Sequence, residues 1–119
     1  MQGLVILNAH AGKIPDYKNM NVVEWAICNN DKVIGTVHRI DYGIDTGAVW
    51  LEKEIVINRP TNLTEAREFA FDLVIRMVAT AVVMNENSEI KEVKYGVDEG
   101  KKWYKMHSYF QDMVNRKLS

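Results

Sequence analysis

Three polar side chains near the N-terminus are of the types needed for acyl transfer. Asn8 and His10 stand two residues apart where an apolar run ends, and Asp45 follows within the glycine-bounded segment 43–47. An imidazole titrates near neutral pH and can carry a proton, and an amide can donate a hydrogen bond to a developing oxyanion. A carboxylate close to the imidazole can orient it or hold an ordered water. Together these groups predict transfer of an acyl group to an amine.

The pattern around these residues predicts strands that alternate with a helix. The continuous apolar run 4–7 is typical of a strand covered on both faces, and the β-branched segments 32–40 and 48–57 predict two more strands. Between the first two strands, Asn21 and Glu24 have the spacing of a capping box, which predicts a short helix starting at residue 22. The order is therefore strand, helix, strand, loop, strand.

This order offers a topological reason for the three polar groups to meet. If the first two strands are parallel, a right-handed crossover joins them, and their carboxyl ends lie at the same edge of the sheet. Open α/β sheets bind ligands at that edge. Asn8 and His10 would end the first strand, and Asp45 would lie in the loop that leaves the second.

The second half of the chain predicts a long core helix and smaller elements after it. Asn62 and Glu65 form another capping box at the start of this helix. The apolar residues that follow keep helical spacing as far as Val82. Segment 90–95 predicts a short strand. A C-terminal helix is expected to bury its apolar side, formed by Tyr109, Phe110, Met113 and Val114.

Composition limits the class of protein. A chain of 119 residues with 47% hydrophobic residues predicts a single domain, 1–119, with a core of its own. The net charge of −1 gives no general attraction for nucleic acid or anionic membrane, so neither is an expected partner. A lone cysteine, no visible signal peptide and no membrane-length apolar run indicate a cytoplasmic protein.

Five short motifs carry a resemblance to a known family. In order and at suitable distances, they resemble the later half of the formyltransferase domain that uses 10-formyltetrahydrofolate. That family includes glycinamide ribonucleotide, methionyl-tRNA and sugar N-formyltransferases. The motifs are Asn8-Ala9-His10, Ile14-Pro15-Asp16-Tyr17, Trp25-Ala26-Ile27, Val37-His38-Arg39-Ile40-Asp41 and Gly43-Ile44-Asp45-Thr46-Gly47.

The resemblance implies a fold and a set of site residues. The fold would be α/β, a partial Rossmann-like formyltransferase sheet with flanking helices, from which the N-terminal half of the domain is missing. Asn8, His10 and Asp45 would be catalytic, with His10 as the proton shuttle. The formyl donor would be 10-formyltetrahydrofolate, bound by Asp41, Gly43, Ile44, Asp45 and Thr46. The primary amine acceptor, for which an amino sugar nucleotide is favoured, would contact Gly12, Lys13, Tyr17 and Lys18.

Other interpretations stand beside this one. Taken alone, Asn8 and His10 more often form a strand end and a structural histidine than a catalytic pair. The chain could also be a non-catalytic assembly domain or a fragment of a longer protein, because the usual preceding half is absent. An open sheet edge would then favour a homodimer or higher oligomer. A metal-dependent hydrolase using His38 and Asp41 with His10 and Asp45 is weakly supported, since the spacing of His38 and Asp41 has no metal signature, and no metal is expected.

Overall fold

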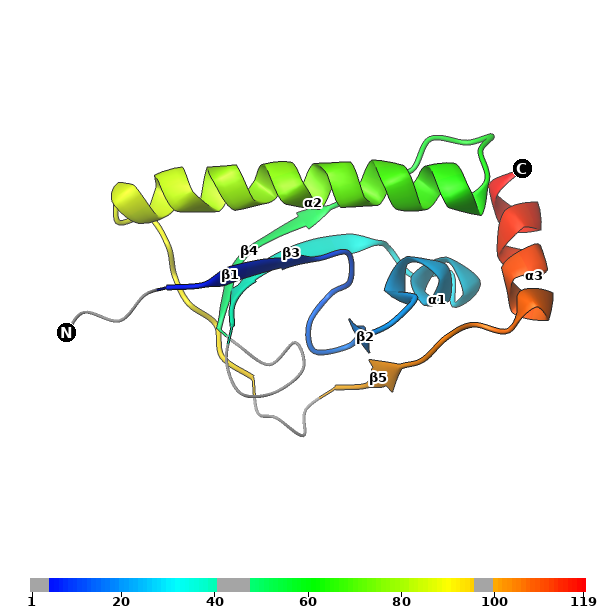
Figure 1. The fold of residues 1–119 in the computed structure, drawn as a ribbon, viewed down its shortest axis with the longest axis horizontal. Helices are drawn as coiled ribbons and strands as arrows, with labels where there is room; N and C mark the ends of the chain where they lie inside the picture. Colours follow the sequence, from blue (N-terminus) through cyan, green and yellow to red (C-terminus); the bar gives the residue numbers. More distant parts are fainter. Residues whose placement is uncertain (1–4, 41–47, 96–99) are drawn as a thin grey trace.

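The computed structural model describes residues 5–40, 48–95 and 100–119. A three-stranded sheet and three helices form its main body, and two very short strands lie beside them (Figure 1). In chain order the elements are β1 (Leu7–His10), β2 (Lys18–Asn19), α1 (Val22–Cys28), β3 (Ile34–Arg39), β4 (Val49–Glu54), α2 (Leu63–Glu86), β5 (Lys102–Trp103) and α3 (Ser108–Leu118).

The main sheet has the order β1-β3-β4, and both of its strand pairs are antiparallel. The strand prediction for segments 32–40 and 48–57 is confirmed over Ile34–Arg39 and Val49–Glu54. A bulge interrupts the β3–β4 ladder between Val37 and His38, because Val37 faces Leu51 while His38 faces Val49. Within the described residues, β1 forms one edge of this sheet.

Helix α2 covers one face of the sheet, over β1 and β3 (Figure 1). The stripe buried against the sheet repeats every three or four residues and comprises Leu63, Ala66, Ala70, Val74, Met77 and Ala81. Gly35 on β3 permits the close approach, because a Cβ there would lie 2.8 Å from Val74 Cγ1 and 2.9 Å from Met77 Sδ. The predicted cap is also confirmed, since the Asn62 side chain accepts a hydrogen bond from the Glu65 amide at 3.0 Å.

The expectation of parallel first strands is wrong. Segment Val22–Cys28 has only seven residues, so α1 rises about 10 Å and does not carry the chain back along the sheet. Strand β3 therefore starts at the end where β1 stops, with His10 opposite Thr36 and Leu7 opposite Arg39. Strand β3 thus ends beside the amino end of β1, and the argument from parallel carboxyl ends does not apply.

Three local predictions also need correction. The first strand begins at Leu7, later than predicted, and Val5 and Ile6 are about half exposed instead of covered on both faces. Asn21 stands at the N-cap of α1, but its side chain makes no capping hydrogen bond: its backbone is left-handed, and its Oδ1 accepts from the Met106 amide at 2.8 Å. Segment 90–95 contributes only one isolated bridge, between Val93 and Val49, in place of a strand.

The C-terminal helix is confirmed, but only part of its predicted apolar side is buried. Val114 and Leu118 are the buried residues of α3, whereas Tyr109 is 61% exposed and Phe110 is 39% exposed. Asn115 Oδ1 accepts from the Leu63 amide at 2.7 Å, which ties α3 to the start of α2. The prediction is therefore confirmed for Val114 and wrong for Tyr109 and Phe110.

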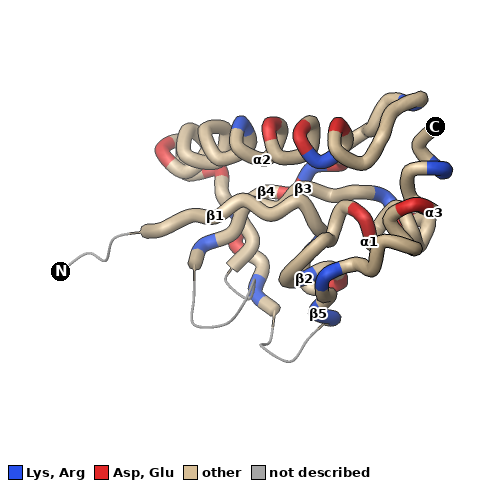
Figure 2. Tube along the Cα trace, turned by 45° about the vertical axis from the view of Figure 1, so that its right-hand side comes forward, with Lys and Arg blue, Asp and Glu red and all other residues tan. Residues whose placement is uncertain are grey.

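The described residues show mixed charge. Figure 2 shows acidic and basic residues along α2 and near β2 and β5, instead of one large field of a single sign. No helix of the described ranges is both long enough and apolar enough to cross a bilayer.

The contact at Gly35 makes a prediction about stability. We expect Gly35→Val to lower the free energy of unfolding by about 1–3 kcal/mol, because the new side chain would push against Val74 and Met77. Urea denaturation measures this change. The control Ala79→Val adds methyl groups on the exposed side of α2 and should change stability by less than about 0.5 kcal/mol. Equal stability of the two variants would contradict the account of α2 packing.

Candidate functional site

A row of polar side chains occupies the sheet face opposite α2. Gly35 faces α2, so the alternation of side chains places Thr36 and the residues in register with it on the other face. Asn8 lies opposite His38, and His10 lies opposite Thr36. Directly opposed residues of an antiparallel pair share a face. The structure therefore brings Asn8 and His10 together, although by a different topology from the one predicted.

His10 is held by the loop that follows β1. The ring is partly buried, and its Nε2 lies 2.7 Å from the carbonyl oxygen of Tyr17. Because a carbonyl can only accept, Nε2 carries the hydrogen in this contact. A proton taken from a substrate by His10 in this orientation must therefore go to Nδ1. Asn8, two residues earlier, is exposed.

The neighbouring β3 residues are structural. Thr36 is fully buried, and its hydroxyl donates to the Gly12 carbonyl at 2.8 Å. A Cβ on Gly12 would lie 2.8 Å from the Tyr17 carbonyl oxygen and 2.9 Å from Val22, so this position requires glycine. His38 is 3% exposed, so it is packed within the strand, opposite Asn8.

A cavity of about 270 Å³ lies next to this polar row. It contains two of the predicted acceptor residues, Lys13 and Tyr17, but neither Gly12 nor Lys18. Its lining is Lys13, Asp16, Tyr17, Asp31, Lys32 and Ile34. The sequence did not indicate Asp31 and Lys32 as site residues, since the segment Asn29-Asn30-Asp31 is typical of a turn that ends a helix. The cavity offers carboxylates and ammonium groups to a polar ligand.

Tyr17 is an anchoring group in this cavity, not a base. Its hydroxyl donates to the Asp31 carboxylate, and Asn29 Nδ2 donates to the same hydroxyl at 3.2 Å. Burial, followed by the hydrogen bond to Asp31, raises the pKa of Tyr17 from its ordinary 10.0 to about 12. The phenol therefore stays protonated at neutral pH.

An aromatic residue from the C-terminal part holds the loop that carries Tyr17. The Trp103 ring stacks on Tyr17 with centroids 5.3 Å apart, and its Nε1 donates to the Asp16 carbonyl at 2.9 Å. Lys18, in β2, pairs with Lys102 of β5, and its side chain is 2% exposed. Lys18 is therefore buried where β2 meets β5, and it does not line the cavity.

Part of the predicted site lies outside the described residues. These positions are Asp41, Gly43, Ile44, Asp45 and Thr46. The described residues on either side of them, Arg39 and Ala48, are joined by a hydrogen bond of 2.8 Å from the Arg39 amide. Within the described residues, no three His, Cys, Asp or Glu side chains come together as metal ligands.

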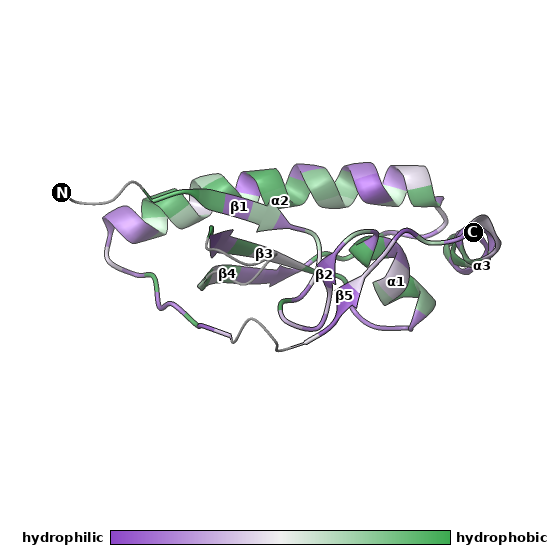
Figure 3. Cartoon of the chain, turned by 60° about the horizontal axis from the view of Figure 1, so that its bottom comes forward, coloured by the Kyte–Doolittle hydropathy of each residue, from purple (hydrophilic) through white to green (hydrophobic). Residues whose placement is uncertain are grey.

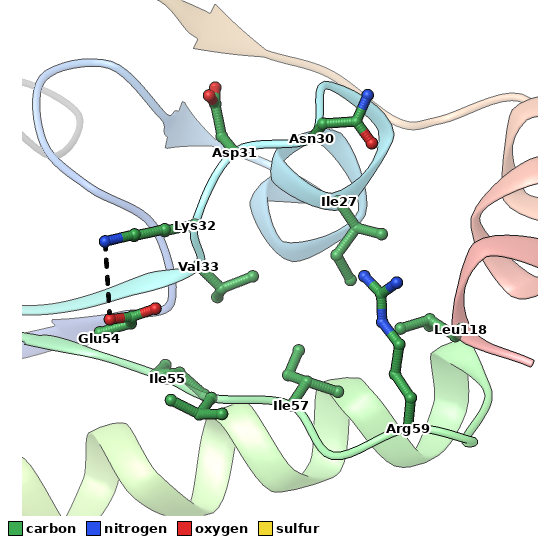
Figure 4. A pocket seen from close by; sticks show the side chains of 11 residues that line it. Ile27, Asn30, Asp31, Lys32, Val33, Glu54, Ile55, Ile57, Arg59 and Leu118 are labelled. Atoms are coloured by element: carbon green, nitrogen blue, oxygen red, sulfur yellow. Dashed lines mark ion pairs between the residues drawn. The ribbon is translucent and has the colours of Figure 1, made fainter.

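A second hollow of about 270 Å³ lies between α1, α3 and the end of β4 (Figure 4). Ile27, Val33, Ile55 and Leu118 form much of its lining, and Arg59 reaches across it. Lys32 and Glu54 stand at its rim 4.0 Å apart. None of the predicted site residues lines this hollow, so it is not the candidate site.

Comparison with known proteins identifies relatives of this chain. A family model described as formyl transferase, for that family's N-terminal domain, matches residues 1–70. Methionyl-tRNA formyltransferase of Thermodesulfovibrio yellowstonii is 42% identical over 57 residues, 47% of this chain and 18% of that protein. GDP-perosamine N-formyltransferase of Brucella melitensis is 32% identical over 95 residues, 79% of this chain and 32% of that protein. The chain thus spans a third or less of these two relatives.

A solved structure has a similar fold. The formyltransferase of Anoxybacillus kamchatkensis, in complex with UDP-4,6-dideoxy-4-formamido-L-AltNAc and tetrahydrofolate, superposes with a TM-score of 0.69 at 18% identity. The match covers 82% of this chain and 51% of that one.

The buried phenol of Tyr17 gives a prediction about pH. Its folded pKa lies above its ordinary value, so its contribution to stability is complete below pH 10 and is lost as the pH rises towards 12. In an absorbance titration, we expect one of the five tyrosines to ionise near pH 12, above the others. Tyr17→Phe should remove this high-pH phase. The matched control Tyr109→Phe, at an exposed position, should leave the high-pH phase unchanged. A late phase that survives in Tyr17→Phe would contradict the assignment.

Proposed function

The chain belongs to the formyl transferase family, and from that premise we propose that it transfers a formyl group from 10-formyltetrahydrofolate to a primary amine. We further propose that residues 1–119 correspond to the later half of the formyltransferase domain. The order of the five motifs supports this placement within the family's N-terminal domain, whose model matches residues 1–70.

One observation carries the assignment of the site. Asn8 and His10 both lie on the sheet face opposite α2. Tyr17, whose carbonyl oxygen accepts the hydrogen bond from His10, also lines the cavity. By register, His10 thus stands between Asn8, the proposed oxyanion donor, and Ile34, which lines the polar cavity. We assign Asp45 to the same site by family resemblance, as the carboxylate that orients the imidazole or an ordered water.

The proposed reaction has two steps. The acceptor nitrogen attacks the formyl carbon, a new carbon–nitrogen bond forms, and the Asn8 amide donates a hydrogen bond to the developing oxyanion. The attacking nitrogen gives up its proton to Nδ1 of His10. The bond between the formyl carbon and N10 of the folate then breaks, and N10 receives a proton from the imidazolium. His10 returns to its starting state, and no other reactant is consumed.

We propose a nucleotide-linked amino sugar as the acceptor. Lys13 and Lys32 could bind its diphosphate, while the Asp16 carboxylate could hold its amine. The relatives act on different acceptors, since one is a GDP-perosamine enzyme and another is a methionyl-tRNA enzyme. Assays with UDP-, GDP- and dTDP-linked amino sugars beside methionyl-tRNA discriminate these classes. Transfer to methionyl-tRNA alone would refute the sugar acceptor.

Replacing the oxyanion donor tests the mechanism. We expect Asn8→Ala to lower kcat/KM for formyl transfer by about 10²–10³, with little change in stability because Asn8 is exposed. Steady-state kinetics and thermal denaturation measure the two effects. Asn58→Ala, at an exposed position away from the site, is the matched control and should retain full activity. Folate-dependent transfer that persists in both Asn8→Ala and Asp45→Ala would refute the assignment.

Direct binding of a reduced folate separates the enzyme from the alternative of a non-catalytic assembly domain. Calorimetry with tetrahydrofolate should show saturable binding to the intact chain. Absence of both folate binding and transfer would favour the alternative.

A further inference from the structure

The orientation of the His10 imidazole depends on a single peptide unit. Its Nε2 donates to the Tyr17 carbonyl oxygen, which lies 2.7 Å away. A peptide unit is planar, and in the trans form its carbonyl and its amide point to opposite sides. The Tyr17 carbonyl and the Lys18 amide belong to the same trans unit, so they turn together. A contact that holds the Lys18 amide therefore also holds the acceptor of the His10 ring.

Strand β5 and the residue before it hold that amide. Figure 3 shows β5 beside β2, close to α1, and Figure 1 shows the same neighbours. The Lys18 amide donates to the Lys101 carbonyl at 3.0 Å, on the side of the peptide away from His10. Two hydrogen bonds thus run in series from His10 Nε2 through one peptide to Lys101. Hydrogen bonds that are linked in this way polarise and strengthen one another.

Trp103 fixes the residues on both sides of this peptide. Its ring stacks on the Tyr17 ring, with centroids 5.3 Å apart and an interplanar angle of 16°. Its Nε1 donates to the Asp16 carbonyl at 2.9 Å, and its own carbonyl accepts from the Met20 amide at 3.2 Å. Contacts before and after the peptide therefore restrict rotation of the peptide plane.

Gly100 allows this segment to approach the loop. Its φ is +76°, in the left-handed region that favours glycine. A Cβ at this position would overlap the Pro15 carbonyl, and the same carbonyl accepts from the Lys101 amide at 3.0 Å. A side chain at position 100 would therefore push the segment away from the loop without removing Trp103.

We infer that Lys101 and Trp103 position His10 for proton transfer, an inference that rests on the proposed function. With its Nε2 hydrogen bonded to the Tyr17 carbonyl, the ring is left with Nδ1 to accept the proton of the attacking amine. Neither Lys101 nor Trp103 lines the cavity, so both act through the peptide between Tyr17 and Lys18. Because Tyr17 also lines the cavity, the same contacts fix one wall of the cavity relative to the imidazole.

Substitutions of Trp103 test this role by NMR. In the wild-type chain, we expect a coupling across the hydrogen bond between His10 Nε2 and the Tyr17 carbonyl carbon. Trp103→Leu should raise the exchange rate of the Nε2 proton with water at least about fivefold, because opening of this hydrogen bond becomes easier. Trp103→Phe keeps an aromatic ring for stacking and should accelerate the exchange less.

Trp50→Leu is the matched control. Trp50 is 9% exposed and bonds Glu92 at 2.9 Å, so its loss also weakens the core. Because it does not bond the loop that carries Tyr17, the His10 proton should exchange less than about twofold faster. Equal acceleration in Trp50→Leu and Trp103→Leu would overturn the proposal, since it would then reflect lost stability alone.

Gly100→Ala tests the other end of the contact and keeps all three tryptophans. It should accelerate the exchange of the Nε2 proton as Trp103→Leu does, because it separates the segment from the loop. This variant keeps the proposal testable if Trp103→Leu does not fold. Unchanged exchange in folded Gly100→Ala, or a neutral wild-type His10 that carries its hydrogen on Nδ1, would overturn the proposal.

Formyl-transfer assays separate this proposal from the proposed function. In an active chain, Trp103→Leu should lower kcat by about 10–100-fold, because the imidazole is no longer held in its orientation. An unchanged kcat in Trp103→Leu would refute the positioning role and leave the proposed function standing. Faster exchange in Trp103→Leu, with no folate-dependent transfer by the wild-type chain, would refute the proposed function and still support control of the imidazole by Trp103.

Discussion

The close contact of α2 with Gly35 determines how the rest of the chain is arranged. Because the helix lies directly on β3 at a residue without a side chain, one face of the sheet is fully occupied by apolar packing. Polar side chains that alternate with the buried ones must then stand on the other face, and Asn8 and His10 are among them. The position of the candidate site is therefore a consequence of the core. Loss of this contact would affect both faces of the sheet.

The site loop depends on a segment that lies far away in sequence. Residues 100–106 run beside the loop after β1, where the Lys101 amide bonds the Pro15 carbonyl at 3.0 Å and Lys18 returns a bond to Lys101. Trp103, in this segment, stacks on Tyr17. Lys101 Nζ lies 4.0 Å from the centroid of the Trp103 ring. Since the Tyr17 carbonyl holds the His10 ring, the C-terminal segment takes part in orienting the imidazole. This explains why the two parts of the chain pack as one unit.

The sequence predicted the helices and strands correctly where contacts between residues near in sequence determine them. Asn62 caps α2 because its side chain reaches an amide three residues away, and β-branched residues form β3. Long-range contacts decided the rest. Asn21 has the spacing of a capping residue, yet its side chain bonds the Met106 amide, which sequence spacing cannot reveal. The antiparallel direction of β3 likewise follows from how little of the sheet a seven-residue helix can span.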